Sequence, residues 1–384
     1  MRVVVDARYL SDPFGSMTVY CRNLLRALGE LYPRTPPVAL VPRELHPSAQ
    51  AIRDELGEQV RWVRPETERH GLGMLPGELR WVHRDIPSLI ARWVPDAELL
   101  IMPYHHPPAR TPGVRRVVVL HDLCGLGAGF PKHKKAYWRH YLRLRAAAHL
   151  ADAIVPISRA TRDEMAARFP ASRSRLSPVL YNGQDRDPVS HQDTTRVLSE
   201  HDLEMRTYVV AFATWQERKN FGATLGALAE QRRQGLRTTR LVGIAPGREH
   251  DSIRRRCTAA GLDDAVILSG VPDDDLDALY AGSLALLWPS TCEGFGYPVL
   301  EAMMQGCPPL VGDRGPGAEL VHGAIAPLTS LTPETIAARL DTLASQGSGQ
   351  RAELAETLRA RAAQFSATAY RDQLYHVLEG LDAG

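Results

Sequence analysis

The 384-residue chain is poor in lysine, since only four of its 46 basic residues are lysines and the other 42 are arginines. Three of the lysines lie between positions 132 and 135, and the fourth is Lys219. The formal net charge is only +2, which gives no general reason to expect a nucleic-acid partner. A high-GC genome explains most of the arginine bias, but it does not explain where lysine remains.

Long apolar runs are also absent. No stretch approaches the roughly 18 residues that a membrane-spanning helix needs, and apolar segments such as 117–120 have the length of strands. The N-terminus reads as a strand rather than a signal peptide, because Asp6 and Arg8 interrupt it. The protein is therefore expected in the cytoplasm. Its five cysteines include no CxxC pair, so no metal site is expected.

Several catalytic motifs are missing as well. The chain contains no GxxxxGKS/T phosphate loop, no HExxH and no GxSxG, which excludes the enzyme classes that depend on them. The glycines Gly125, Gly127 and Gly129 follow a predicted strand, but the third is misplaced for the GxGxxG pattern of dinucleotide sites. A flexible loop is the simpler interpretation of this stretch.

What the chain does contain is two series of short apolar strands that alternate with helical patterns. Strands are predicted at 3–6, 38–41, 99–102, 117–121 and 153–157 in the first series, and at 208–213, 240–244, 265–268, 284–288 and 309–312 in the second. Their nearly continuous apolar character suits parallel sheets with helices on both faces. The sequence therefore predicts an α/β fold with two Rossmann-like, doubly wound domains facing a central cleft.

The predicted domain boundaries follow the same alternation. Residues 1–190 form the first domain and residues 205–362 the second, and the polar stretch 182–206 is the best candidate for a linker between them. Residues 363–384 are predicted as a C-terminal helix that returns to the first domain. No internal sequence repeat relates the two halves.

The most informative stretch reads PSTCEGFGYPVLEAMMQG and places Glu293 and Glu301 eight positions apart. Pro298 fits the first position of a helix and Gly306 the position after its end. The upstream strand therefore leads into a helix N-terminus, whose free N–H groups attract an anion. Carboxylates beside it can accept hydrogen bonds from the hydroxyls of a sugar or ribose. The alternative is a pair of exposed glutamates beside a structural turn.

This stretch resembles the signature of family 4 of the retaining nucleotide-sugar glycosyltransferases, which share the GT-B fold. Further segments resemble other elements of that family, in the same order along the chain. They are His121-Asp122-Leu123 for the HDL element, residues 157–162 for S-x-x-T-R, residues 217–220 for the RKN loop and residues 272–280 for an acidic helix start. The resemblance covers most of the chain.

The resemblance implies a donor site on the second domain. Glu301 is expected to bind the ribose hydroxyls and Glu293 to face the transferred sugar. The backbone between them is expected to contact the donor through Gly294, Phe295, Gly296 and Tyr297. Relatives carry a Gly-Gly pair in the first loop, near the diphosphate and the acceptor. Here the loop reads FGSM, so only Gly15 can take that part.

The resemblance also implies that Arg218 and Lys219 neutralise the diphosphate. Breaking the glycosidic bond puts negative charge on the nucleoside diphosphate, and fixed cations stabilise that charge. The reaction is then expected to need neither a metal nor another cofactor. A compact ammonium suits a close phosphate contact, although a surface lysine that caps a loop is the alternative for Lys219.

The first domain is expected to hold the acceptor. By resemblance His121 contacts the transferred sugar, with Asp122 beside it on the acceptor side, and a structural histidine is the alternative. Tyr104, His105 and His106 follow a predicted strand of the same domain. Their position alone makes them candidates to line the acceptor pocket.

A basic, aromatic stretch at 132–145 holds the other three lysines together with Tyr137, Trp138 and Tyr141. Such a stretch can make a peripheral contact with an anionic membrane or with an anionic acceptor. The alternative is a solvated helix whose aromatic side chains pack inward. The sequence does not decide between these interpretations.

The expected activity is transfer of a hexose-type sugar, with retention, from a nucleoside-diphosphate sugar to a hydroxyl of a small-molecule or saccharide acceptor. The arginine- and alanine-rich composition suggests a high-GC bacterium, in which natural products such as antibiotics are common acceptors. A transferase for cell-envelope polysaccharides or lipid-linked saccharides is one alternative. A non-catalytic sugar-binding protein on the same fold is another. The base, the sugar, the linkage and the oligomeric state are not predicted.

Overall fold

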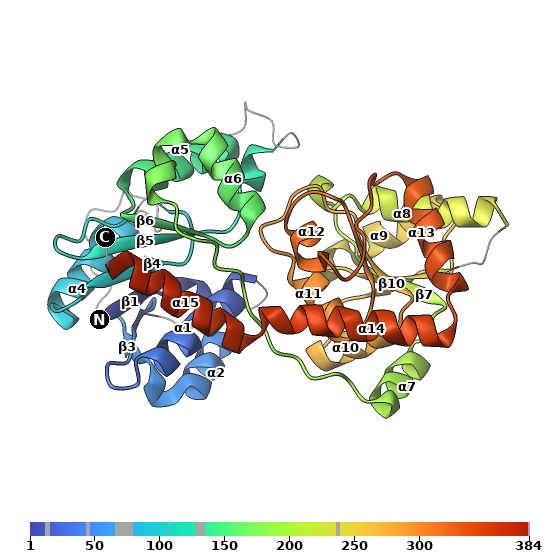
Figure 1. Cartoon of the computed structure of the whole chain (residues 1–384), viewed down its shortest axis with the longest axis horizontal. Helices are drawn as coiled ribbons and strands as arrows, with labels where there is room; N and C mark the ends of the chain where they lie inside the picture. The colour runs from blue at the N-terminus through green and yellow to red at the C-terminus, as the bar shows by residue number, and fades with distance from the viewer. Residues whose placement is uncertain are drawn as a thin grey trace. The chain divides into compact units, whose positions relative to one another are not determined.

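The computed structural model describes residues 1–11, 16–43, 47–65, 80–106, 108–127, 135–235 and 239–382. The chain folds into two compact units (Figure 1). The first unit comprises Met1–Gln184 together with the chain from Ser366 onward, and the second comprises Asp185–Phe365. The last helix of the chain therefore packs with the N-terminal half.

The first unit is built on a six-stranded parallel sheet in the order β3-β2-β1-β4-β5-β6. Its strands are β1 (Val3–Asp6), β2 (Val38–Leu40), β3 (Arg61–Val63), β4 (Leu99–Met102), β5 (Arg115–Leu120) and β6 (Ala153–Pro156). Five of these strands were predicted. The edge strand β3 was not, because only one of its three residues is fully buried and the apolar signal is correspondingly weak.

Helices surround this sheet. The longer ones are α1 (Ser16–Leu31), α2 (Pro47–Leu56), α4 (Ile86–Trp93), α5 (Lys135–Leu150), α6 (Arg159–Arg168) and α15 (Ala367–Asp382), and a short π-helical turn, η3, spans Trp81–Asp85. Helix α1 buries Leu24, Leu25 and Leu28 at helical spacing. It also packs against α15, the dark red helix in Figure 1, which ties the end of the chain to its beginning.

The second unit has a five-stranded parallel sheet in the order β11-β10-β7-β8-β9. Its strands are β7 (Tyr208–Phe212), β8 (Arg240–Ile244), β9 (Val266–Leu268), β10 (Ala285–Trp288) and β11 (Pro309–Val311). All five were predicted, because each contains an apolar run; four of them are buried over most of their length, and β9 buries only its central residue. The two doubly wound sheets that the sequence predicts are therefore confirmed.

The helices of the second unit alternate with its strands. They are α7 (His191–Glu200), α8 (Phe221–Arg233), α9 (His250–Ala259), α10 (Asp273–Gly282), α11 (Tyr297–Met304), α12 (Pro316–Val321), α13 (Pro333–Ser345) and α14 (Ser348–Ala362). A short 3-10 turn, η6 (Glu217–Lys219), precedes α8. Helix α13 packs on α8, and α14 packs on α11.

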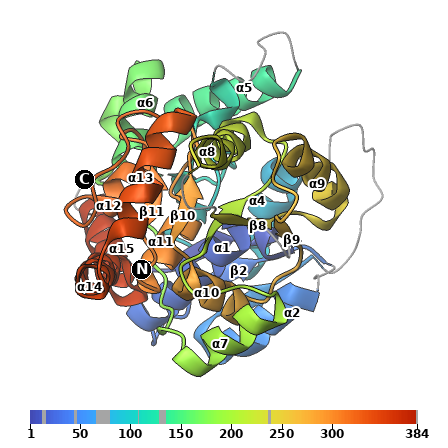
Figure 2. The same cartoon turned by 90° about the vertical axis from the view of Figure 1, so that its right-hand side faces the viewer.

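The chain passes from the first unit to the second at residues 184/185, within the polar stretch 182–206 that was predicted as a linker, but that stretch also contains the helix α7. The Ser190 hydroxyl caps the helix by accepting a hydrogen bond from the Asp193 N–H. The helix buries Thr194, Val197 and Leu198 and packs beside α10 (Figure 2). Three buried residues in a polar stretch are too weak a pattern to distinguish a helix from a linker.

Within the described residues, no helix combines the length and the apolar character that crossing a membrane requires.

Candidate functional site

The strand order of the second sheet reverses between β7 and β10, so the loops after these two neighbouring strands lie side by side. The loop after β7 carries Arg218 and Lys219, and the loop after β10 carries Ser290 and Glu293. Hydrogen bonds join the loops. The Thr291 N–H donates to the Arg218 carbonyl oxygen over 2.8 Å, and the Ser290 hydroxyl donates to the same oxygen over 2.9 Å.

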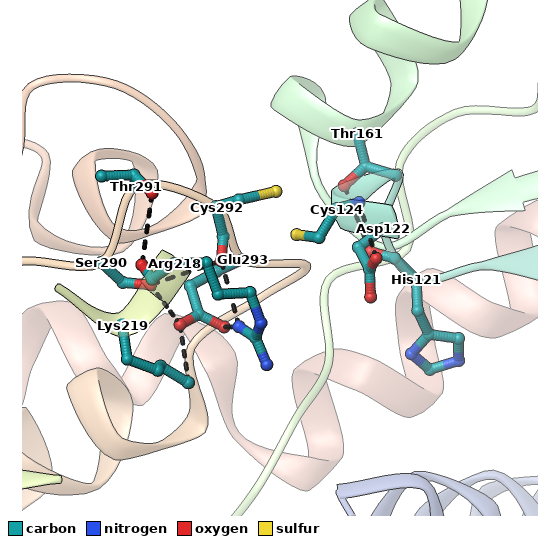
Figure 3. Close-up of polar contacts among 10 residues, drawn as sticks. All are labelled: His121, Asp122, Cys124, Thr161, Arg218, Lys219, Ser290, Thr291, Cys292 and Glu293. Carbon is teal, nitrogen blue, oxygen red and sulfur yellow. Dashed lines mark hydrogen bonds and ion pairs between the residues drawn. The ribbon is translucent and has the colours of Figure 1, made fainter. Parts of the chain in front are cut away.

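Glu293 is the centre of this cluster, as Figure 3 shows. Its Oε1 lies 2.6 Å from the Lys219 Nζ and accepts a 2.6 Å hydrogen bond from the Ser290 hydroxyl. Its Oε2 accepts a 3.0 Å hydrogen bond from the Arg218 Nη1. The side chains of Glu293 and Lys219 are only 14% and 16% exposed. Two cations facing one carboxylate leave a formal charge of +1 in a partly buried place, which favours an anionic ligand.

Lys219 has a second anchor in the ring of Trp288, the last residue of β10. The ammonium nitrogen lies 4.1 Å from the ring centroid, a distance at which the electron-rich ring face attracts a cation. Trp288 is buried, so the contact fixes the ammonium above a rigid surface. Sequence reasoning missed both Trp288 and Ser290, although both lie within five residues of Glu293.

The helix start predicted after the glycines is confirmed. Helix α11 begins at Tyr297, Pro298 occupies its first turn, and Gly296 precedes it with a φ of +103°, a conformation that favours glycine. Phe295 is buried, with its ring 5.4 Å from that of Tyr297. Its side chain therefore belongs to the packing, and its backbone is what it can offer a ligand. The donor-binding role of this segment stays a prediction.

Glu301 lies outside the Glu293 cluster and has its own cation. The Arg186 Nη2 lies 3.2 Å from the Glu301 Oε1, while the Arg186 Nη1 lies 3.1 Å from the Asp277 Oδ2. Asp277 belongs to the acidic start of α10, and burial raises the pKa of its carboxyl against the opposing attraction of Arg186. All three side chains are largely buried. Arg186 thus fixes the orientation of the glutamate that was predicted to bind ribose.

In the first unit, His121 directly follows β5 and is buried. Its Nε2 lies 2.7 Å from the Pro103 carbonyl oxygen, and burial lowers the pKa of the imidazole to about 4. The neutral ring must therefore carry its proton on Nε2, because a carbonyl can only accept, and Nδ1 is the acceptor nitrogen. The sugar contact predicted for His121 remains untested.

The S-x-x-T-R segment supports this loop (Figure 3). The Ser158 side chain caps α6 by accepting from the Thr161 N–H, and the Thr161 hydroxyl donates to the His121 carbonyl oxygen over 3.2 Å. The Asp122 Oδ1 accepts a 2.8 Å hydrogen bond from the Cys124 N–H, which gives Asp122 a part in shaping the turn. Its predicted acceptor contact stays a prediction.

Tyr104, His105 and His106 follow β4, but they do not share one environment. Tyr104 and His106 line a cavity of the first unit. The His105 side chain is fully buried, with its Nε2 3.2 Å from the His140 Nδ1, and it does not line that cavity. Its acceptor-binding role stays a prediction. Position after a strand could not reveal which of two adjacent histidines points inward.

Two predictions fall outside the described residues. Gly15 lies in 12–15, and the basic stretch 132–145 is described only from residue 135. In the part of the chain that the structure describes, no group of three or more His, Cys, Asp or Glu side chains is placed to hold a metal ion.

Comparison with known proteins gives a family match for part of the chain. Residues 198–364 match the family model described as glycosyl transferases group 1. The match lies within the second unit. The O-antigen chain mannosyltransferase B of Escherichia coli is 30% identical over 216 residues, which cover 53% of this chain and 55% of that protein. The chain thus spans about half the length of this curated relative.

Solved structures extend the similarity to the whole chain. The Anabaena protein HepE, in complex with UDP and glucose, has a TM-score of 0.72 at 18% identity and covers 99% of this chain and 100% of its own. WaaG, a glycosyltransferase involved in lipopolysaccharide biosynthesis, has a TM-score of 0.69 at 16% identity, with 97% and 98% covered. At these identities the similarity establishes the fold, which is the predicted GT-B fold.

The buried histidines predict a loss of stability in mild acid. Burial and neighbouring charges lower the pKa of His106 to about 2, and burial lowers that of His121 to about 4, against about 6.5 in an unfolded chain. Below about pH 6.5 the unfolded chain therefore binds protons that the folded chain does not bind. The histidines' contribution to the free energy of unfolding is complete above about pH 6.5 and falls as the pH drops toward 4.

We expect the free energy of unfolding from urea titrations to fall by about 1 kcal/mol per buried histidine between about pH 7 and pH 5.5. His121→Asn offers a matched variant, because an amide can donate to the Pro103 oxygen without titrating. Its pH dependence should be shallower than that of the natural protein, and identical slopes would contradict the explanation.

Replacing Arg186 by methionine should destabilise the second unit by about 3–5 kcal/mol, because Glu301 and Asp277 would lose their shared cation in a buried place. Arg196→Met is the control. Arg196 also bridges two carboxylates, those of Glu200 and Asp275, but its side chain is 50% exposed, so its loss should cost about 0–1 kcal/mol. Thermal unfolding of the two variants measures the difference, and equal losses would refute a special role for Arg186.

Proposed function

We propose that the protein is a retaining glycosyltransferase that moves a hexose-type sugar from a nucleoside-diphosphate sugar to a hydroxyl of its acceptor. The observation that carries this proposal is the cluster of Arg218, Lys219 and Glu293 at the reversal point of the second sheet. Such a reversal point is where doubly wound sheets bind nucleotides. The glycosyl transferases group 1 match covers the same residues, and structural neighbours were solved with UDP or UDP-glucose, which supports a nucleotide-sugar donor.

The chemistry proposed for this cluster is stabilisation of the leaving group. When the bond between sugar and diphosphate breaks, negative charge develops on the diphosphate oxygens. Lys219 and Arg218 are held in place before the reaction by Glu293 and Trp288, so no reorganisation is needed as that charge appears. Glu293 also offers carboxylate oxygens to the sugar hydroxyls. Under this proposal the two side-chain cations neutralise the diphosphate charge that a metal ion neutralises in other enzymes, and no cofactor is required.

Glu301 is assigned to the ribose, with Arg186 behind it. A carboxylate that is already paired with a guanidinium keeps its charge and accepts hydroxyl hydrogen bonds from a fixed position. The acceptor is assigned to the first unit, through the cavity that Tyr104 and His106 line and the neutral imidazole of His121. This division of labour follows from the chemistry of the two sets of side chains, one cationic and one mainly aromatic.

For the acceptor, we propose a saccharide. One relative is an O-antigen chain mannosyltransferase, and the structural neighbour WaaG is involved in lipopolysaccharide biosynthesis, which favours the cell-envelope alternative over a natural-product acceptor. The natural-product alternative rests on composition alone. A non-catalytic sugar-binding protein is disfavoured, because the cationic cluster and both glutamates of the motif are intact.

The donor experiment measures release of the nucleoside diphosphate from a panel of UDP-, GDP- and dTDP-sugars in the presence of mixed saccharide acceptors. Lys219→Ala should reduce turnover by about a hundredfold or more, the typical loss when one preorganised charge-stabilising group is removed. Arg233→Ala, at an exposed arginine near the end of α8, is the matched control and should turn over normally.

Two outcomes would contradict this proposal. One is the absence of turnover with every donor, which together with nucleotide binding by calorimetry would favour the non-catalytic alternative. The other is full activity of Lys219→Ala, which would remove the lysine from the site. Circular dichroism of each variant separates loss of chemistry from loss of fold.

A membrane contact through α5 is the second candidate property. The side chains of Trp138 and Leu142 are 52% and 58% exposed and lie one turn apart on the helix, beside the exposed Lys135 and Arg139. Apolar side chains flanked by cations suit the interface of an anionic bilayer. We propose that this face of α5 contacts anionic lipid.

Co-sedimentation with phosphatidylglycerol-containing vesicles tests the contact. The natural protein should bind, less so at high salt, while the double variant Trp138→Ala, Leu142→Ala should bind several-fold more weakly. Trp215→Ala is the control, since Trp215 is 55% exposed but lies in the second unit. Binding that is equal on vesicles without anionic lipid, or unchanged in the double variant, would rule out this use of α5.

A further inference from the structure

The first unit contains a cavity of about 490 Å³, a size within the range of about 300–1,000 Å³ that small-molecule sites span. Its lining includes residues that follow β1 and β4, between which the strand order of the first sheet reverses. Its lining includes Arg8, Tyr9, Trp81, Tyr104, His106 and Arg143. Four of these six side chains are aromatic rings, and the two that carry a charge are both arginines.

A buried carboxylate organises one wall of this cavity. Asp6, the last residue of β1, is fully buried. It accepts a 2.8 Å hydrogen bond from the Trp81 Nε1 and lies 3.0 Å from the Arg8 Nη2. A buried carboxylate costs several kcal/mol unless it is paired, so Asp6 holds its two partners firmly. The indole and the guanidinium are thereby fixed in the wall before any ligand arrives.

The second cation of the cavity comes from α5. Arg143 of this helix is one of the lining residues. Burial first, and then the charges of Arg8 and Arg143, lower the pKa of the His106 imidazole to about 2. The histidine is therefore neutral at physiological pH and adds no charge of its own. The walls present two guanidinium groups, and the carboxylate of Asp6 lies beneath one of them.

The aromatic rings give the cavity flat faces. The rings of Tyr9 and His106 are stacked, with centroids 5.9 Å apart and planes 14° apart. The ring of Tyr104 lies 5.1 Å from that of His106, and the Arg8 guanidinium lies 5.2 Å from the centre of the Tyr9 ring. Flat apolar faces next to guanidinium groups suit a ring that carries an anionic substituent, since guanidinium binds carboxylate and phosphate through paired hydrogen bonds.

We propose that this cavity binds an acceptor saccharide that carries an anionic group, a uronate carboxylate or a phosphate. The anion lies against Arg143 and Arg8, and a sugar face lies against the aromatic rings of Tyr9 and Trp81. This inference rests on the proposed function, because it names the acceptor class of the same transferase. It predicts that the charge on the acceptor, not only its ring, determines recognition.

The test compares ligands that differ only in the anionic group, by calorimetry on the full chain without any donor. 4-Nitrophenyl β-glucuronide is compared with 4-nitrophenyl β-glucoside for the carboxylate, and glucose 6-phosphate with glucose for the phosphate. At least one anionic member should bind tenfold or more tightly than its neutral partner, and the two pairs show which anion is preferred.

Variants locate the binding. Arg143→Gln should abolish the preference for the anionic member, whereas Arg110→Gln, at an exposed arginine of the same unit, should retain it. If Arg143→Gln fails to fold, Arg143→Lys keeps the charge without the planar fork and should reduce the preference several-fold. Nuclear magnetic resonance saturation transfer from the protein to the bound sugar ring provides an independent readout of the same contact.

Equal affinity within both pairs, no binding of any of the four ligands, or a preference that survives in Arg143→Gln would overturn the proposal. These outcomes are distinct from failure of the proposed function, because ligand binding in the first unit is measured without donor and without turnover. If the protein binds the anionic sugars preferentially but releases no nucleoside diphosphate, this binding site is supported and the proposed transferase activity is contradicted. Turnover with neutral acceptors alone would support the transferase activity and contradict the anionic acceptor site.

Discussion

The reversal of strand order in each sheet is the constraint on which both candidate sites depend. The two strands beside a reversal are neighbours in the sheet although they are distant in the sequence, so the loops at their carboxyl ends come together at the edge where such sheets bind ligands. In the second unit these loops follow β7 and β10 and bring Lys219 to Glu293 across 74 positions of sequence. In the first unit they follow β1 and β4 and bring Arg8 and Tyr104 to one cavity.

Within each site, a poorly exposed carboxylate fixes the groups that would meet a ligand. Glu293 holds Arg218 and Lys219, Glu301 is held by Arg186, and Asp6 holds Arg8 together with an indole N–H. Since each charge withdrawn from water must be paired, the geometry of the pair leaves little freedom to either partner. Fixed charges of this kind are the most effective ones in a reaction that develops charge on a leaving group. The pairing that burial requires therefore also gives these side chains the fixed positions that the proposed function needs.

The parts of this arrangement that the sequence predicts are those with a local signal. Apolar runs predict ten of the eleven strands, and Pro298 with Gly306 predicts the bounds of α11 almost to the residue. Contacts across long sequence separations have no such signal. Arg186 meets Glu301 across 115 positions, and in the sequence it is one arginine among 42. Whether His105 or His106 faces the cavity likewise depends on packing against α5, which no pattern within residues 104–106 contains.

Lysine is scarce in this chain, but its presence at position 219 has a physical reason. The Lys219 ammonium contacts a ring face at 4.1 Å and a carboxylate oxygen at 2.6 Å at the same time, which a compact cation with three rotatable N–H donors can do. A planar guanidinium meets a ring with its flat face and a carboxylate with its edge, so its two partners must lie in perpendicular directions. Arg218 already donates to the other oxygen of Glu293. Arginine occupies 42 of the 46 basic positions, but at position 219 the simultaneous contacts with a ring face and a carboxylate oxygen suit the compact ammonium of lysine.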